Sequence, residues 1–267
     1  MVSLLRLLNE IKGNPKALIL AGAPGAGKGS ILRGLNLGGL KIFNLDDTIA
    51  ALSKSDGFTL NQKAASAEDR SKFAKAMAAA TKNLKTELIP TAVANKDSFV
   101  LDGTSASFKN TIELKQQLEE AGYDVMMLYV YTDLETSLDR NEKRFEKSGG
   151  EDRSLYPGAL LGTWLNVAKN FETYQQLFGD NFVSVSNTGK DETLKDIEAI
   201  LQKYVYPFIP KDAKPKTDKE KAKSKEAADK LNAEMTTFLN SDQTKNIINS
   251  SVSKEEAQTK INKFIQS

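Results

Sequence analysis

The stretch AGAPGAGKGS, residues 21–30, decides how the rest of the chain is interpreted. It follows the apolar run ALILA and precedes ILRGL. Gly22, Gly27 and Lys28 match the pattern G-x-x-x-x-G-K-[ST], in which a glycine-rich loop between a strand and a helix surrounds phosphate oxygens. We therefore predict a phosphate-binding loop at this point of the chain.

In such a loop, backbone N–H groups point at phosphate oxygens and the lysine reaches the outer phosphates. The pattern ends in a hydroxyl that holds a magnesium ion, but here Gly29 takes that place and the hydroxyl follows at Ser30. The order K-G-[ST] resembles the loop of adenylate kinase and related small-molecule kinases, whose metal is held mostly by phosphates, water and carboxylates. The alternative is a glycine-rich turn without a ligand. The nucleotide-binding candidates are Gly22, Ala23, Pro24, Gly25, Ala26, Gly27, Lys28, Gly29 and Ser30, and Ser30 is also a candidate metal ligand.

The composition limits the chemistry that is available. The chain has 267 residues, 40% of them apolar, which suits one α/β domain with an addition. A formal net charge of +2 argues neither for nor against nucleic acid as a partner. Histidine and cysteine are both absent, which excludes histidine-based acid–base catalysis, disulfides and nearly all zinc sites. The lack of cysteine is compatible with a reducing compartment, and we expect a cytoplasmic protein.

Five short apolar runs alternate with segments of helical periodicity between residues 17 and 205. Near-continuous apolar strands separated by helices are typical of a parallel sheet that is covered on both faces. We predict a doubly wound α/β fold of the P-loop NTPase type, with five parallel strands in the order 2-3-1-4-5. The runs are ALILA (17–21), LKIFN (40–44), SFVLDG (98–103), DVMMLYVYT (124–132) and NFVSVS (181–186).

Helices are expected between these runs. Thr132 and Glu135 have the spacing of a capping box after the fourth strand. Pro157 suits the first turn of a helix whose apolar face continues to Gly179. A further apolar stripe at helical spacing comprises Phe73, Met77, Ala80, Leu84 and Leu88.

Changes in composition divide the chain into four parts. We expect an N-terminal helix over 1–14, the phosphate-loop domain over 15–206, a charged linker or helix over 207–230, and a small helical appendage over 231–267. A last helix should begin at Ser253 with a capping box. No apolar run reaches the length of a transmembrane helix, and we expect no membrane partner.

Two adjacent carboxylates, in FNLDDT, follow the second strand. Ligands of doubly wound sheets bind at the carboxyl ends of the strands, and kinases that phosphorylate a hydroxyl need a carboxylate to orient it. Asp46 is our candidate for this base, with Asp47 in reserve. The alternative use of an aspartate here is a helix cap, which we expect of Asp47.

A third carboxylate, Asp102, ends the apolar run VLDG. A carboxylate at the end of a buried strand is placed to orient magnesium in phosphate-loop enzymes, so Asp102 is a candidate metal ligand. The alternative is a turn residue, since Asp-Gly is a frequent turn pair.

Arginines gather in DRNEKRFEKSGGEDR, residues 139–153. Arg140 and Arg144 are four residues apart, on one face of a helix near its end, and Arg153 follows a Gly-Gly break. Arginines on such a segment can close over a transferring phosphoryl group and neutralise its charge. The alternative is an ordinary solvated helix end with salt bridges.

The fifth strand leads into SNTGK, where Asn187 and Thr188 are candidates for contacts with the base of a nucleotide. A plain turn explains this segment equally well. Trp164, Tyr156 and Phe171 could stack on a base, but a helical apolar stripe favours packing in the core.

These motifs together resemble those of polynucleotide 5′-hydroxyl kinases and zeta-toxin-like kinases. GAPGAGKGS, NLDD (44–47), LDGT (101–104) and LDRNEKR (138–144) occur in the same order. The chain is also similar to uncharacterised kinase-like ATPases of tailed bacteriophages. The resemblance covers roughly residues 15–205. It departs from the family pattern at Gly29, where serine or threonine is usual, and after Asp47, where an arginine that clamps an acceptor phosphate is missing.

The resemblance implies an ATP-dependent phosphotransferase that uses magnesium. It places Lys28 on the donor phosphates, Asp46 as the base, Asp102 near the metal or acceptor, and Arg140 and Arg144 in a lid. The acceptor would be a hydroxyl or phosphate, such as a polynucleotide 5′-hydroxyl, with a nucleotide or nucleoside kinase as the alternative. A different class is an ATP-binding interaction module with little turnover, whose C-terminal helices dock a protein partner. A viral source would place the protein in the host cytoplasm.

Overall fold

The computed structural model describes residues 13–35, 37, 40–150, 152–188, 197–204 and 217–267. Most of the expected N-terminal helix, residues 1–12, lies outside these ranges, as do 205–216 of the expected linker. Among the described residues, no helix has the length and apolar character needed to span a membrane.

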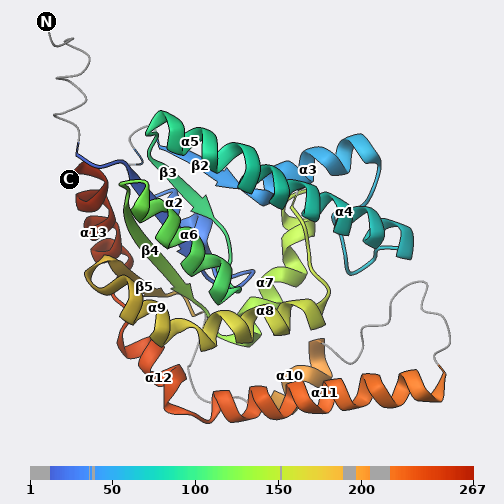
Figure 1. Cartoon of the computed structure of the whole chain (residues 1–267). Helices are drawn as coiled ribbons and strands as arrows, with labels where there is room; N and C mark the ends of the chain where they lie inside the picture. Colours follow the sequence, from blue (N-terminus) through green and yellow to red (C-terminus); the bar gives the residue numbers. More distant parts are fainter. Residues whose placement is uncertain (1–12, 36, 38–39, 151, 189–196, 205–216) are drawn as a thin grey trace, which may run out of the picture.

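Five parallel strands form one sheet in the order β2-β3-β1-β4-β5, as predicted (Figure 1). The register aligns Leu18 of β1 with Val100 of β3 and with Met126 of β4. Because all strands are parallel, their carboxyl ends lie at the same edge of the sheet. The strands are β1 (Lys16–Ala21), β2 (Lys41–Asn44), β3 (Phe99–Asp102), β4 (Asp124–Tyr131) and β5 (Phe182–Ser186).

The two faces of the sheet are buried by separate groups of helices. Ile19 and Met127 belong to a large core that includes side chains of α5 (Ile89–Asn95), α6, α7, α8, α9, α10, α11 and α12. Leu18 and Leu128 point to the opposite face, where α2 and α13 cover them. Burial on both faces explains why the central strands β1 and β4 are almost entirely apolar, whereas Ile42 of the edge strand β2 is 49% exposed. The remaining bounds are α2 (Lys28–Leu32), α6 (Phe108–Glu120), α7 (Leu134–Lys147), α8 (Pro157–Lys169), α9 (Phe171–Phe178), α10 (Ile197–Tyr204), α11 (Asp218–Leu239), α12 (Asp242–Asn249) and α13 (Lys254–Gln266), with a 3₁₀ turn at Gly179–Asn181.

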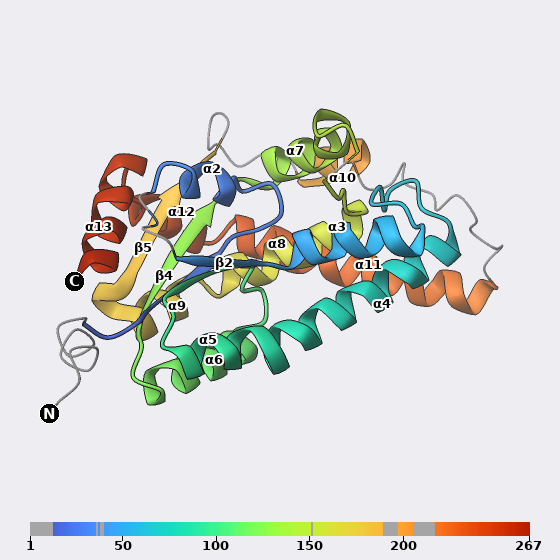
Figure 2. The same cartoon turned by 90° about the horizontal axis from the view of Figure 1, so that it is seen from above.

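A small third core holds two helices beyond the edge of the sheet. Helices α3 (Leu45–Asp56) and α4 (Ala67–Asn83) pack around Ile49, Phe58 and Ala80, and both views show them projecting away from the strands (Figures 1 and 2). The expected apolar stripe is only partly buried, since Leu88 is 36% exposed. A π-helical turn, Leu84–Leu88, joins α4 to α5 just before Pro90, whose ring lacks an N–H for regular helical bonding.

Two local expectations were wrong. Helix α7 is capped by Asp133, whose side chain accepts a hydrogen bond from the Thr136 N–H, whereas the Thr132 hydroxyl donates to the carbonyl of Asn187. The apolar segment from Pro157 to Gly179 is broken at Asn170 into α8 and α9. The side-chain amide of Asn170, at this break, donates to the carbonyl of Ala106.

The C-terminal helices pack against both faces of the sheet. Met235 and Phe238 of α11 enter the large core beside α8, while Ile261 of α13 is fully buried on the opposite face. Ser253 caps α13, as expected, by accepting the Glu256 N–H, but the Glu256 side chain does not return the bond that would complete the predicted capping box. The Val252 N–H donates to the carbonyl of Ser184, which forms an isolated bridge at the edge strand β5. Helices α12 and α13 lie beside this strand (Figure 2). The division of the chain into domains stays a prediction.

Candidate active site

The predicted site residues converge at the carboxyl edge of the sheet. Each of the five strands delivers part of the site at its end, as expected for a doubly wound sheet. The parts are the glycine loop after β1, Asp46 after β2, Asp102 at the end of β3, the arginines of α7 after β4, and Asn187 after β5.

Two glycines of the loop are required by its geometry. Gly25 and Gly27 have φ values of 81° and 91°, in the region that side chains rarely adopt. A Cβ on Gly25 would lie 2.8 Å from the carbonyl oxygen of Ser137, and one on Gly27 would collide with the side-chain amide of Asn187. The loop is therefore tightly packed against α7 and the end of β5.

Side chains from outside hold three consecutive carbonyl groups of the loop. The Ser137 hydroxyl and Arg140 guanidinium come from α7, and the Asn187 amide comes from the end of β5. Fixing the carbonyls fixes the orientation of the peptide planes. The three bonds are Ser137 Oγ to Pro24 O (2.5 Å), Arg140 Nη1 to Gly25 O (3.1 Å) and Asn187 Nδ2 to Ala26 O (2.7 Å).

The loop N–H groups are correspondingly free. Within the described ranges, those of Gly25, Gly27, Lys28 and Gly29 donate to no protein acceptor. A run of such donors in left-handed and turn conformations forms a concave anion-binding surface. Helix α2 has only five residues, so its dipole is small.

The position of Gly29 is sterically open. An added Cβ would meet no atom within 4 Å, and the residue is exposed in the first turn of α2, as is Ser30. Glycine is therefore not required at this position by the fold. The backbone permits a hydroxyl directly after Lys28, although the chain places its hydroxyl one residue later.

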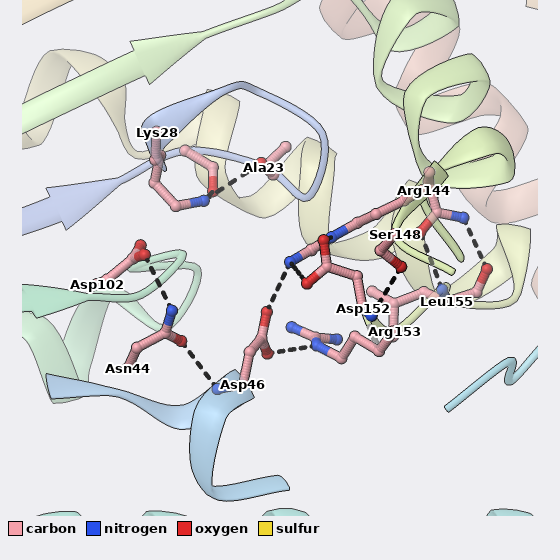
Figure 3. Close-up of polar contacts among 12 residues, drawn as sticks. Ala23, Lys28, Asn44, Asp46, Asp102, Arg144, Ser148, Asp152, Arg153 and Leu155 are labelled. Atoms are coloured by element: carbon pink, nitrogen blue, oxygen red, sulfur yellow. Dashed lines mark hydrogen bonds and ion pairs between the residues drawn. The ribbon is translucent and has the colours of Figure 1, made fainter. Parts of the chain in front are cut away.

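Lys28 is folded back onto its own loop. Its Nζ donates to the carbonyl of Gly22 at 2.8 Å and lies 3.4 Å from that of Ala23 (Figure 3). Burial lowers the pKa of Lys28 to about 8, although the carboxylates of Asp102 and Asp46 oppose this shift. A ligand phosphate would replace the carbonyl contacts with a full negative charge.

Asp46 lies across from Lys28 and is held by two arginines. Arg153 Nε donates to its Oδ1 at 2.5 Å, and Arg144 Nη2 to its Oδ2 at 3.3 Å (Figure 3). Burial by itself would raise the pKa of Asp46, but Arg153 and Arg144 outweigh it and hold the pKa below its ordinary value. Arg144 also contacts Asp152, with Nε 3.3 Å from Oδ2.

Arg140 and Arg144 share a helix but have different partners. Arg140 reaches the glycine loop, while Arg144 turns to Asp46. Arg153 joins Arg144 because Asn141 anchors its segment through two hydrogen bonds with the backbone of Leu155, at 2.8 and 2.9 Å. The sequence pointed to Arg153 only as a lid arginine after a glycine break. Its partner Asp46 lies 107 positions earlier in the chain.

The expectation that Asp47 caps α3 was wrong. Asn44 caps α3, with its side-chain oxygen accepting the N–H of Asp46 at 2.8 Å, and Asp47 lies in the first helical turn. Asn44 also donates to Asp102 Oδ2 at 3.3 Å. Sequence reasoning missed this residue, although asparagine before a helix is a recognised capping signal.

Asp102 is half-buried beside this amide at the end of β3. Burial raises the pKa of Asp102, Asp46 adds to the increase, and Lys28 opposes it. The described residues contain no cluster of three acidic side chains that could hold a metal alone. Magnesium commonly binds through one or two carboxylates together with nucleotide phosphates, so a single carboxylate at Asp102 fits that mode.

The remaining candidates have simpler positions. Asn187 supports the loop through Ala26, and Thr188 lies beside it, so contacts of either with a nucleotide base stay predictions. Trp164 and Phe171 are each 1% exposed, which confirms that both belong to the core. Tyr156 is exposed on the surface.

The sheet order and the glycine loop define a P-loop kinase-like α/β fold. The zeta toxin family model matches residues 5–196, and the chain belongs to the zeta toxin family. The resemblance to phage ATPases stays a prediction. No curated protein sequence matches the chain.

Solved structures with low sequence identity are similar to this chain. The AvrRxo1-ORF1:-ORF2 structure with ATP has 16% identity and a TM-score of 0.50, covering 96% of this chain and 82% of that one. A structure of the PezAT chromosomal toxin–antitoxin system of Streptococcus pneumoniae has 15% identity and a TM-score of 0.44, covering 89% and 95%. At these identities the first comparison supports the fold alone.

Proposed function

We propose that the protein is a phosphotransferase that moves the γ-phosphoryl group of ATP to a hydroxyl acceptor. One observation carries this proposal: Lys28, on a glycine loop with free N–H groups, lies near two carboxylates, Asp46 and Asp102, and two arginines contact Asp46. Phosphoryl transfer relies mainly on positioning and on stabilising negative charge, and these groups supply both. Membership of the zeta toxin family supports the same reaction class.

The donor would bind at the glycine loop. The N–H groups of Gly25, Gly27 and Gly29 would surround phosphate oxygens, and Lys28 would leave the carbonyl of Gly22 to contact the outer phosphates. The similar AvrRxo1-ORF1:-ORF2 structure was obtained with ATP, which supports ATP as the donor. Asp102, with Ser30 in a secondary role, would hold magnesium, which supplies charge neutralisation between the phosphates.

Asp46 would orient the acceptor hydroxyl. Its lowered pKa keeps it ionised, so it can accept a hydrogen bond from the hydroxyl throughout the neutral pH range. Because the transition state of phosphoryl transfer is loose, orientation matters more than early proton removal. Arg144 and Arg153 would exchange part of their contact with Asp46 for the transferring phosphoryl group, and Arg140 lies at the loop to assist.

The proposal also includes the chemical class of the acceptor. A polynucleotide 5′-hydroxyl is the first candidate and a nucleoside or nucleotide the second. A different class is an ATP-binding interaction module, which the engagement of Asp46 by two arginines would also permit. In that case the exposed charged residues of α11 would bind a protein partner.

The test is transfer of label from [γ-³²P]ATP with magnesium to a panel of acceptors. The panel contains 5′-hydroxyl DNA and RNA, nucleosides, nucleoside monophosphates and amino sugars. A labelled acceptor product supports the kinase, and its identity decides among acceptor classes. ATP binding by calorimetry without a labelled product from any acceptor would favour the interaction module.

A further inference from the structure

Asn44 occupies a position between the two candidate carboxylates. It is the last residue of β2, and the sheet register pairs it directly with Asp102 at the end of β3. Its Oδ1 accepts the backbone N–H of Asp46 at 2.8 Å, and its Nδ2 donates to Oδ2 of Asp102 at 3.3 Å (Figure 3). One side chain thus connects the start of α3 with the end of the neighbouring strand.

The hydrogen-bond network determines the orientation of this amide. A backbone N–H can only donate, so the atom facing Asp46 must be the amide oxygen, and the NH₂ group must then face Asp102. Among the residues that commonly cap helices, serine and threonine are shorter, and aspartate has no donor when ionised. Only asparagine combines the cap with a donor on a separate atom.

We propose that Asn44 is a positioning residue that fixes Asp46 and Asp102 relative to each other for phosphoryl transfer. It sets the backbone of Asp46 through the helix cap and holds one oxygen of Asp102 through its amide. The assignment rests on the proposed function. It adds a neutral connection between two carboxylates that both face Lys28, where a third acidic side chain would add repulsion.

Three substitutions separate the helix-capping role of Asn44 from its hydrogen bond to Asp102. Asn44→Ser retains a capping oxygen but is too short to reach Asp102, Asn44→Asp retains the cap but replaces the donor with a carboxylate, and Asn44→Ala removes both. Ser66→Ala is the matched control, because Ser66 caps α4 through the Asp69 N–H at 3.0 Å and lies outside the site.

The measurements are the melting temperature, the KM for ATP and kcat for transfer. We expect Asn44→Ser to keep the wild-type melting temperature and KM. Its kcat should fall about tenfold to a hundredfold, which is typical when a residue that orients a functional side chain is lost. Asn44→Asp should lose at least as much kcat. Asn44→Ala should lose both stability and kcat, and Ser66→Ala only stability. Wild-type kcat in Asn44→Ser would overturn the assignment, because it would reduce Asn44 to a cap.

A crystal structure of the Asn44→Ser variant tests the geometry without depending on activity. We expect the start of α3 to be unchanged and the carboxylate of Asp102 to be displaced from its wild-type position. An unchanged Asp102 carboxylate would overturn the assignment. If the wild-type protein transfers no phosphoryl group to any acceptor, the proposed function fails, and this structural comparison alone decides whether Asn44 positions Asp102.

Discussion

Lys28 shows how one side chain is prepared for a charged ligand. Its ammonium group is placed among loop carbonyls and near two carboxylates, and burial still lowers its pKa to about 8. The protein surroundings therefore destabilise the charge that a bound phosphate would stabilise. Binding an anion relieves this cost, which gives the residue a measurable effect on affinity and on pH dependence.

Replacing Lys28 with alanine removes the charge that is proposed to contact the donor phosphates. We expect the affinity for magnesium-ATP to fall by more than about 2 kcal/mol, since charge-assisted contacts commonly contribute that much. Isothermal titration calorimetry measures the change. Lys41→Ala is the control, because Lys41 is exposed and pairs with Asp97 away from the loop. Unchanged affinity in the Lys28 variant would refute its assignment.

The pH dependence of binding follows from the same pKa. Below pH 8 Lys28 is already protonated, and above pH 8 nucleotide binding must raise its pKa and take up a proton. The affinity for ATP should therefore fall as pH rises above about 8. Calorimetry in buffers of different ionisation enthalpy should show proton uptake at pH 9 in the wild type. Equal uptake in Lys28→Met would assign the proton to another group.

Gly29 offers a second test of the loop. A serine side chain fits there, since an added Cβ meets no protein atom within 4 Å. We nevertheless expect no gain in turnover or in magnesium affinity from Gly29→Ser, because in the proposed site Asp102 and the nucleotide would supply the metal contacts. A clear increase in either quantity would mean that the missing hydroxyl limits the enzyme.

At the scale of elements, α13 acts as part of the core. Ile261 is fully buried against the sheet face that contains Leu18 and Val185, while Lys260 beside it is half exposed and pairs with Glu256. The last helix therefore completes a face that α2, with five residues, cannot cover alone.

Ile261→Ala should lower the free energy of unfolding by about 2–5 kcal/mol, as for other large-to-small core substitutions. Lys260→Ala on the same helix should change it by about 0.5 kcal/mol or less, because it removes only an exposed ion pair. Urea denaturation provides both values. Similar small effects of the two substitutions would contradict the packing of α13.

Local sequence patterns predicted the strands and the glycine loop. The five strands and the glycine loop were confirmed, because apolar runs and the glycine motif each leave a clear local pattern. The strand order was also confirmed, but it followed from the fold type that the glycine loop indicates. The break at Asn170 and the cap at Asp133 were missed, since neighbouring patterns competed with them. The pairing of Arg153 with Asp46 could not be predicted, because it depends on tertiary packing across the chain.

At the scale of the whole molecule, the fold brings the proposed nucleotide-binding loop and the proposed acceptor-orienting carboxylate to one edge of the sheet. The loop after β1 and the carboxylates after β2 and β3 face each other because the strands are parallel neighbours. Helix α7 contributes to both sides, with Arg140 on the loop and Arg144 on Asp46. This common helix provides a physical connection between nucleotide binding and the carboxylate proposed to orient the acceptor.

Asp46→Asn provides the most direct test of the proposed chemistry. The substitution removes the proton acceptor and the charge that Arg153 and Arg144 contact, so some loss of stability accompanies it. Calorimetry of ATP binding on the same preparation controls for folding. Asp47→Asn, at the neighbouring position, is the matched control. It should lower the free energy of unfolding by only about a few tenths of a kcal/mol, since Asp47 does not cap α3.

The deciding measurement is the rate of label transfer from [γ-³²P]ATP to the acceptor in wild-type, Asp46→Asn and Asp47→Asn proteins. A carboxylate that orients and deprotonates the acceptor contributes about 10²–10⁴-fold to the rate. We expect Asp46→Asn to lose transfer by that factor while ATP affinity survives, and Asp47→Asn to retain both. Wild-type transfer rates in Asp46→Asn, or loss in Asp47→Asn alone, would contradict the account.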